Sequence, residues 1–124
     1  MAQYTVSQTC YFSAAHVLRN YPAACERLHG HNYKVIIKLV ANELDHLGMV
    51  VDYVDIEQVA QKYISQIDHQ YLNNIPPFDQ INPTAENVAA WLFNNIAKDI
   101  NNERVKLAAI TIWETDHNFV TYEI

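Results

Sequence analysis

Two stretches of two-residue alternation constrain the fold of this chain more than any other feature. In residues 4–16 the even positions carry most of the apolar side chains and end on His16, whereas the odd positions are largely hydroxyl-bearing. Residues 31–42 alternate again, with Tyr33, Val35, Ile37 and Leu39 on one parity and Asn32, Lys34 and Lys38 on the other. A period of two is typical of strands with one buried face, so both stretches are predicted to be half-buried strands.

Two helices are predicted after these strands. The segments Leu18–Glu26 and Glu43–Gly48 are turn-like, and Asp52 is placed to cap a helix of roughly residues 53–66. A loop over Asn73–Pro83 precedes a second helix, whose N-cap is either Asn82 or Thr84. Apolar residues recur with helical spacing at Ile56, Val59, Ala60, Tyr63, Ile64 and Ile67, then at Ala85, Val88, Ala89, Leu92, Ile96 and Ile100.

Two further strands are predicted near Lys106–Glu114 and Asn118–Glu123, the first with Ala108, Ile110, Ile112 and Glu114 on one face. The order β-β-α-α-β-β predicts an α+β fold, with a four-stranded antiparallel sheet and both helices on one face. Such a sheet has two open edges, and open edges invite pairing. We therefore expect an oligomer joined edge to edge.

Composition limits the class of protein. The 124 residues suit a single domain over residues 1–124. The formal net charge is −6, with 8 Lys and Arg against 14 Asp and Glu, so we expect no nucleic-acid partner. No apolar run is long enough to cross a bilayer, and the N-terminus lacks a basic-then-apolar signal. We therefore expect a cytoplasmic protein with no membrane partner and with free thiols.

Three histidines on the first two strands suit a metal ion. His29 and His31 are two residues apart, so on an extended strand both project to one face, and His16 ends the apolar series of the first strand. Three imidazoles leave a tetrahedral Zn²⁺ one open position, which a substrate oxygen can occupy. If neither strand carries a bulge, the pattern predicts a catalytic zinc site on His16, His29 and His31.

Cys25 lies four residues before His29 and close to Arg27. Nearby positive charge stabilises a thiolate, which favours a reactive thiol that acts as a base or nucleophile. Two other interpretations stay open for Cys25: a fourth zinc ligand, which would close the site into a structural one, or a small buried apolar side chain. Cys10 fits the buried role, because it lies mid-strand on the apolar parity.

Two carboxylates are further candidates. Asp68 precedes His69 and could fix its tautomer for proton transfer, although His69 could equally complement the C-terminal dipole of the first helix. Glu114 follows an apolar row, where a carboxylate can accept two parallel N–H bonds from a flat heterocycle; its alternative is a solvated turn charge. Glu86 lies in the first turn of the second helix, where the dipole alone explains its charge.

Taken together, these motifs resemble the 6-pyruvoyl-tetrahydropterin synthase / 6-carboxy-tetrahydropterin synthase family over nearly the whole chain. The resemblance rests on segments in matching order and at matching intervals: Phe12-Ser13-Ala14-Ala15-His16, Cys25-x-x-Leu28-His29-Gly30-His31, Asp68-His69-x-x-Leu72-Asn73, Asn82-Pro83-Thr84-x-Glu86 and Glu114-Thr115. The four-residue interval from Cys25 to His29 is most similar to the bacterial 6-carboxy branch of queuosine biosynthesis.

The resemblance implies a tunnelling fold (T-fold), in which trimers close their sheets into a barrel and two trimers stack into a hexamer. Sites would lie between subunits, so that Asp68 and His69 of one subunit serve the zinc of its neighbour. It also implies a lyase that converts 7,8-dihydroneopterin triphosphate to 6-carboxy-5,6,7,8-tetrahydropterin, with loss of acetaldehyde and triphosphate. The small-molecule partner would be this pterin triphosphate, and the cofactor Zn²⁺.

The same resemblance implies roles for single residues. Cys25, Asp68 and His69 would be catalytic, and Glu114 would hold the N–H edge of the pterin with Thr84 near the ring. Arg27 is the candidate for the triphosphate. Glu26 departs from the family pattern, which has a smaller residue after the cysteine, and its charge would raise the pKa of the Cys25 thiol. Two alternatives are a 6-pyruvoyl-tetrahydropterin synthase and a non-catalytic, zinc-stabilised pterin-binding module.

Overall fold

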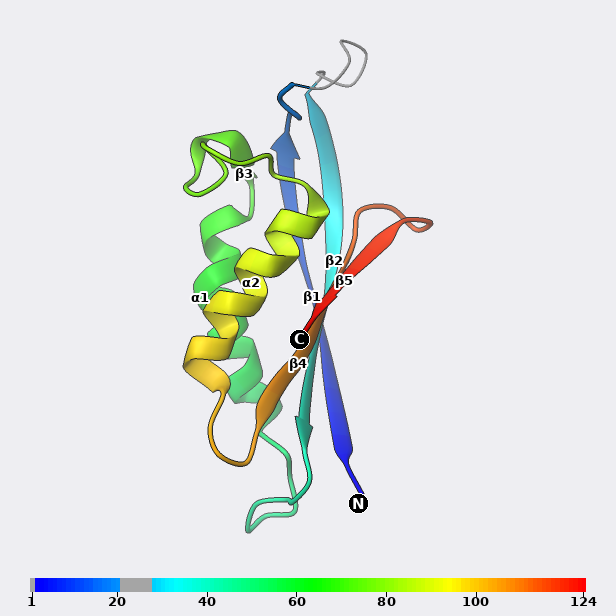
Figure 1. Cartoon of the computed structure of the whole chain (residues 1–124), viewed down its shortest axis with the longest axis vertical. Helices are drawn as coiled ribbons and strands as arrows, with labels where there is room; N and C mark the ends of the chain where they lie inside the picture. The colour runs from blue at the N-terminus through cyan, green and yellow to red at the C-terminus, as the bar shows by residue number, and fades with distance from the viewer. Residues whose placement is uncertain (1, 21–27) are drawn as a thin grey trace.

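The computed structural model describes residues 2–20 and 28–124. Two long strands form the centre of one sheet, and two helices lie together on one side of it (Figure 1). The elements are β1 (Tyr4–His16), β2 (His29–Ala41), α1 (Tyr53–Ile67), β3 (Gln70–Tyr71), the 3₁₀ turn η2 (Leu72–Asn74), α2 (Ala85–Ile100), β4 (Lys106–Trp113) and β5 (Phe119–Glu123). No helix of the described chain has the length and apolarity needed to span a membrane.

The β1–β2 ladder confirms the alternation argument. Its antiparallel register runs without a shift from Tyr4 opposite Ala41 to His16 opposite His29. Because no bulge intervenes, the parity of each strand is kept to its end, and His16, His29 and His31 share the side of the buried Tyr33. The ladder therefore carries the three imidazoles, on the core side, to the end of the sheet that lies beyond the helices.

The sheet has five strands in the order β3-β1-β2-β4-β5, not the four antiparallel strands expected. The extra strand is Gln70–Tyr71, which runs parallel to β1 and pairs with Ala14 and Ala15. His69, just before it, has a positive φ of 59°, and its amide donates to the Ser13 carbonyl. This local turn lays the chain that leaves α1 along β1. A two-residue strand has too little sequence for a period-two signal, which is why the pattern did not reveal it.

Both helices begin as their N-caps predict. The Asp52 carboxylate accepts from the Val54 amide, and the Thr84 hydroxyl accepts from the Asn87 amide. Thr84 is thus the N-cap of α2, and Asn82 is not. The apolar stripes of α1 and α2 pack on the core side of the sheet, where the core residues of β2 and β4 are almost fully buried.

A bulge in β4 overturns one predicted face. Lys38 pairs with Ala109 whereas Leu39 pairs with Leu107, so Ala108 has no partner opposite it. An extra residue shifts the side-chain parity by one. Leu107 therefore takes the buried position and Ala108 is half-buried, while Ile110, Ile112 and Glu114 keep the shared parity expected of them.

Candidate metal and pterin site

Three imidazole rings gather where β1 ends and β2 begins. The ring centroids are 5.9 Å apart for His16 and His29, 5.7 Å for His16 and His31, and 6.3 Å for His29 and His31. His16 is buried, with 4% of its surface exposed, whereas His29 and His31 are half-buried. The spacing on the sequence and the register of the ladder thus bring together the three residues expected to hold a metal.

The surroundings of His16 suit a neutral imidazole. Burial is the main cause that lowers its pKa, to about 4, and the neighbouring His31 and His29 lower it further. The Tyr33 hydroxyl lies 3.1 Å from His16 Nδ1, which leaves Nε2 free of that contact. A ligand ring held by a hydrogen bond at its other nitrogen is typical of metal-binding histidines. Tyr33 was not among the residues singled out from the sequence, because only the β1–β2 register places it beside His16.

The residue types and their placement fit Zn²⁺, although the rings are spread more widely than in a bound site. Imidazoles on one tetrahedral Zn²⁺, at bond lengths of 2.0–2.1 Å, have centroids about 5 Å apart. Among residues 2–20 and 28–124, no three His, Cys, Asp or Glu side chains stand close enough to hold an ion as they are. The rings would have to approach one another by roughly 1 Å to share one ion.

Asp68 and His69 form a hydrogen-bonded dyad beside β1. Asp68 Oδ1 lies 2.9 Å from His69 Nδ1 and also accepts from the Ser13 amide at 2.9 Å. The Ser13 amide bond is the largest cause that lowers the pKa of Asp68, followed among the lowering causes by the His69 contact. The carboxylate is therefore held ionised and aims at one nitrogen of His69. This contact distinguishes the dyad from a histidine that only complements the helix dipole.

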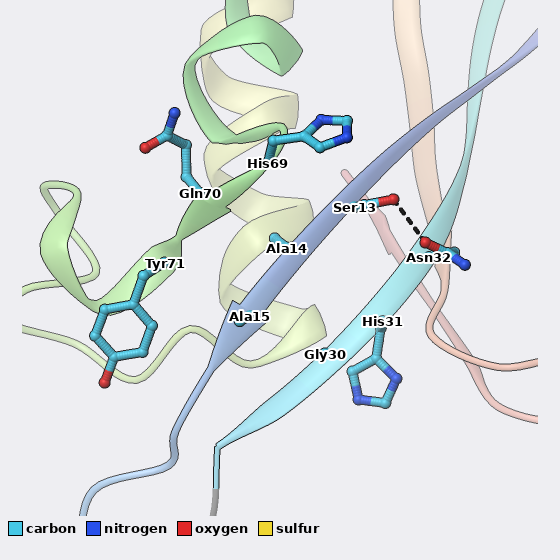
Figure 2. A pocket seen from close by; sticks show the side chains of 9 residues that line it. All are labelled: Ser13, Ala14, Ala15, Gly30, His31, Asn32, His69, Gln70 and Tyr71. Carbon is cyan, nitrogen blue, oxygen red and sulfur yellow. Dashed lines mark hydrogen bonds between the residues drawn. The ribbon is translucent and has the colours of Figure 1, made fainter.

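The dyad faces outward. The His69 side chain is 80% exposed, and it lines an open hollow of about 420 Å³ that His31 of the histidine cluster also lines, together with Ser13, Asn32 and Tyr71. Figure 2 shows His69 and His31 on opposite sides of β1, with the Ser13 hydroxyl bonded to Asn32 between them. Within one chain, His69 and one ligand candidate, His31, thus line the same open hollow, and the His69 imidazole is largely exposed there.

Glu114 lines a second, smaller hollow, between the start of α2 and the β4–β5 hairpin. Its volume is about 180 Å³, and Glu86, Asn118 and Phe119 also line it. Glu114 is half-buried, and its charge adds to burial, the larger cause, in raising the pKa of Tyr33. The helix dipole alone accounts for Glu86 in the sequence, and the fold places Glu86 in the lining of this hollow as well.

The remaining residues considered from the sequence are Thr84, Cys25, Arg27 and Cys10. The Thr84 hydroxyl caps α2 at 3.1 Å from the Asn87 amide, so its oxygen is engaged in the helix start. Cys25 and Arg27, with Glu26, lie outside the described residues. Cys10 is buried in the core, and burial raises its pKa to about 12, with a smaller contribution from Glu57. Cys10 is therefore an unreactive thiol, as its mid-strand position predicts.

Comparisons with known proteins agree on one family. The model of the family described as 6-pyruvoyl tetrahydropterin synthase matches residues 5–124. A 6-carboxy-5,6,7,8-tetrahydropterin synthase of Rickettsia felis is 34% identical over 88% of this chain and 92% of its own length. A dihydroneopterin monophosphate aldolase of Pyrococcus furiosus is 33% identical over 83% and 82%, respectively. The structure of the Caenorhabditis elegans 6-pyruvoyl tetrahydropterin synthase superposes with a TM-score of 0.85 at 30% identity, covering 100% of this chain and 97% of that one.

Proposed function

The chain belongs to the 6-pyruvoyl tetrahydropterin synthase family of pterin lyases, and from this we propose that it is a zinc-dependent 6-carboxy-5,6,7,8-tetrahydropterin synthase. It would convert 7,8-dihydroneopterin triphosphate and water to the 6-carboxy product, acetaldehyde and triphosphate, as a step toward queuosine. The observation that carries this proposal is the cluster of His16, His29 and His31 on one side of the β1–β2 ladder.

Each described residue has a defined task in this reaction. The Glu114 carboxylate accepts the N–H edge of the pterin in the hollow beside α2. Tyr33 holds the His16 ring through Nδ1, which leaves Nε2 as the nitrogen that would bind a metal ion. A zinc ion on the three imidazoles supplies Lewis acidity that lowers the pKa of the side-chain hydroxyls of the substrate. His69, aligned by Asp68, takes and returns the protons that these hydroxyls exchange.

The exposed dyad supports a site shared between subunits. Because the His69 side chain is 80% exposed and the hollow that it lines is open, the dyad of one copy would serve the histidine cluster of a second copy. Within the described sheet, β5 at one edge and the part of β1 that the two-residue β3 does not cover at the other give the copies a way to join, and we propose a dimer of trimers. Cys25, which would shift a proton at the side-chain carbon as a thiolate, completes the proposed catalytic set, and Arg27 would meet the triphosphate.

We expect the products to identify the reaction. Incubation of the purified protein with 7,8-dihydroneopterin triphosphate should release acetaldehyde and triphosphate in equal amounts, measured by aldehyde derivatisation and ion chromatography. A 6-pyruvoyl synthase would release triphosphate without acetaldehyde. An aldol cleavage would instead release a two-carbon aldehyde that still carries phosphate. Either of these two patterns would refute the 6-carboxy assignment, and no turnover at all would favour a binding module.

A Cys25→Ala variant should separate a catalytic thiol from a structural zinc ligand. We expect the metal content and melting temperature to stay at wild-type values, while turnover falls more than about 100-fold, in keeping with the loss of a general acid–base group. Elemental analysis, thermal melts and the acetaldehyde assay measure the three quantities. Loss of zinc together with folding would mean that Cys25 closes a four-ligand structural site.

A further inference from the structure

The chain beyond the end of β1 is held by the side chains of two asparagines. β3 pairs with Ala14 and Ala15, and no strand of the described residues pairs with Val17. The Asn73 carboxamide takes that place: its Oδ1 accepts from the Val17 amide at 2.9 Å, and its Nδ2 donates to the Val17 carbonyl at 3.0 Å. A carboxamide carries the same donor and acceptor as a peptide group, so Asn73 continues the ladder by one rung.

Asn82 repeats the arrangement two residues further on. Its Oδ1 accepts from the Arg19 amide at 2.8 Å, and its Nδ2 donates to the Arg19 carbonyl at 3.0 Å. The Arg19 guanidinium in turn donates to the carbonyls of Phe78 at 2.7 Å, Ile81 at 3.2 Å and Asn73 at 3.4 Å. These reciprocal bonds fasten residues 17–19 to the loop between β3 and α2. The Arg19 guanidinium itself donates to three carbonyl oxygens of this region.

The two asparagines differ in how close the backbone residue that each one bonds lies to His16. Val17 directly follows His16, whereas Arg19 is three residues away from that histidine. Asn73 is itself buried, with 8% of its surface exposed, and it lies four residues after His69. Asn73 thus connects the residue after His16, at the end of β1, to the segment that follows the Asp68–His69 dyad in the chain.

The structure assigns Asn73 as a positioning residue. Its carboxamide holds the Val17 backbone in place and, through it, the ring of His16 at the position from which it would bind the metal ion. This inference rests on the proposed function, because it concerns the affinity for that metal. Loss of a group that orients a ligand typically weakens metal binding about 10- to 100-fold. Aspartate cannot replace asparagine here, since a carboxylate has no donor for the Val17 carbonyl.

Cobalt titration of three variants tests the assignment. Asn73→Ala and Asn73→Asp should bind Co²⁺ about 10- to 100-fold more weakly than wild type, followed by the visible spectrum of tetrahedral Co²⁺ and by competition with a chelator. Asn82→Ala is the matched control: it loses the same pair of backbone bonds, but away from His16. Its Co²⁺ affinity should stay within about threefold of wild type, even if its melting temperature falls as far as that of the Asn73 variants. Circular dichroism confirms that each variant is folded at the titration temperature.

The outcomes separate this inference from the proposed function. Wild-type affinity in Asn73→Ala, or in Asn73→Asp should the alanine variant not fold, would overturn the positioning role alone. Equal weakening in the Asn73 and Asn82 variants would also overturn it, because affinity would then follow overall stability. A wild-type protein that gives no tetrahedral Co²⁺ spectrum would refute the metal centre itself, and with it this inference.

Discussion

Replacement of His31 by alanine will leave a folded protein that neither retains zinc nor turns over the pterin. Removal of a direct ligand should weaken Zn²⁺ binding by more than about 100-fold, which is the upper end of the loss seen when only the groups behind the ligands are changed. The fold should survive because His31 is half-buried and lies beyond the region packed by the helices. Elemental analysis after dialysis and the acetaldehyde assay measure the two losses, and a thermal melt checks the fold.

Two other histidines provide matched controls for this result. His46 and His117 are exposed and lie in turns, and the spacing of neither places it with the cluster. His46→Ala and His117→Ala should keep wild-type metal content and turnover. A His31→Ala variant that still holds stoichiometric zinc and full activity would refute the three-histidine centre. Equal losses in the control variants would show that the effect is not specific to the cluster.

Two inactive variants should restore activity when they share one assembly. His31→Ala removes a metal ligand and His69→Ala removes the proton-transfer imidazole, so each alone should lose more than about 100-fold in turnover. If each site combines the histidine cluster of one subunit with the dyad of another, mixed assemblies contain some sites in which both parts are intact. With equal and random mixing, about a quarter of the sites should be whole. Coexpression of the two variants, separately tagged and purified through both tags, provides the material for the assay.

The control for this restoration is the doubly substituted chain. When the His31→Ala/His69→Ala chain is coexpressed with wild type, only sites built wholly from wild-type subunits should be active. The activity should therefore not exceed the share of such sites. Activity of the mixed single variants that stays at background would mean that each site is built within one chain. The hollow that His69 and His31 line within one chain would then be the place where the two meet.

The order of the main elements could be predicted because each follows from a local pattern. Alternation in residues 4–16 revealed β1, and Asp52 marked the start of α1. Where a single residue broke the pattern, prediction failed. Ala108 sits in a bulge that exchanges its buried position with Leu107, and the short β3 strand has no period to detect. Both depend on which strand lies alongside, and that information is not contained in any local window of sequence.

The sequence by itself determined which way the important side chains point, because the direction of a side chain along a strand follows from the backbone period alone. Since β1 and β2 carry no bulge, the alternation assigns His16, His29 and His31 to one face. Only the tertiary structure decided what each group touches: Tyr33 contacts His16, and the Ser13 amide donates to Asp68. Such contacts join residues far apart in the chain, so they depend on strand register and helix packing, which are properties of the whole fold.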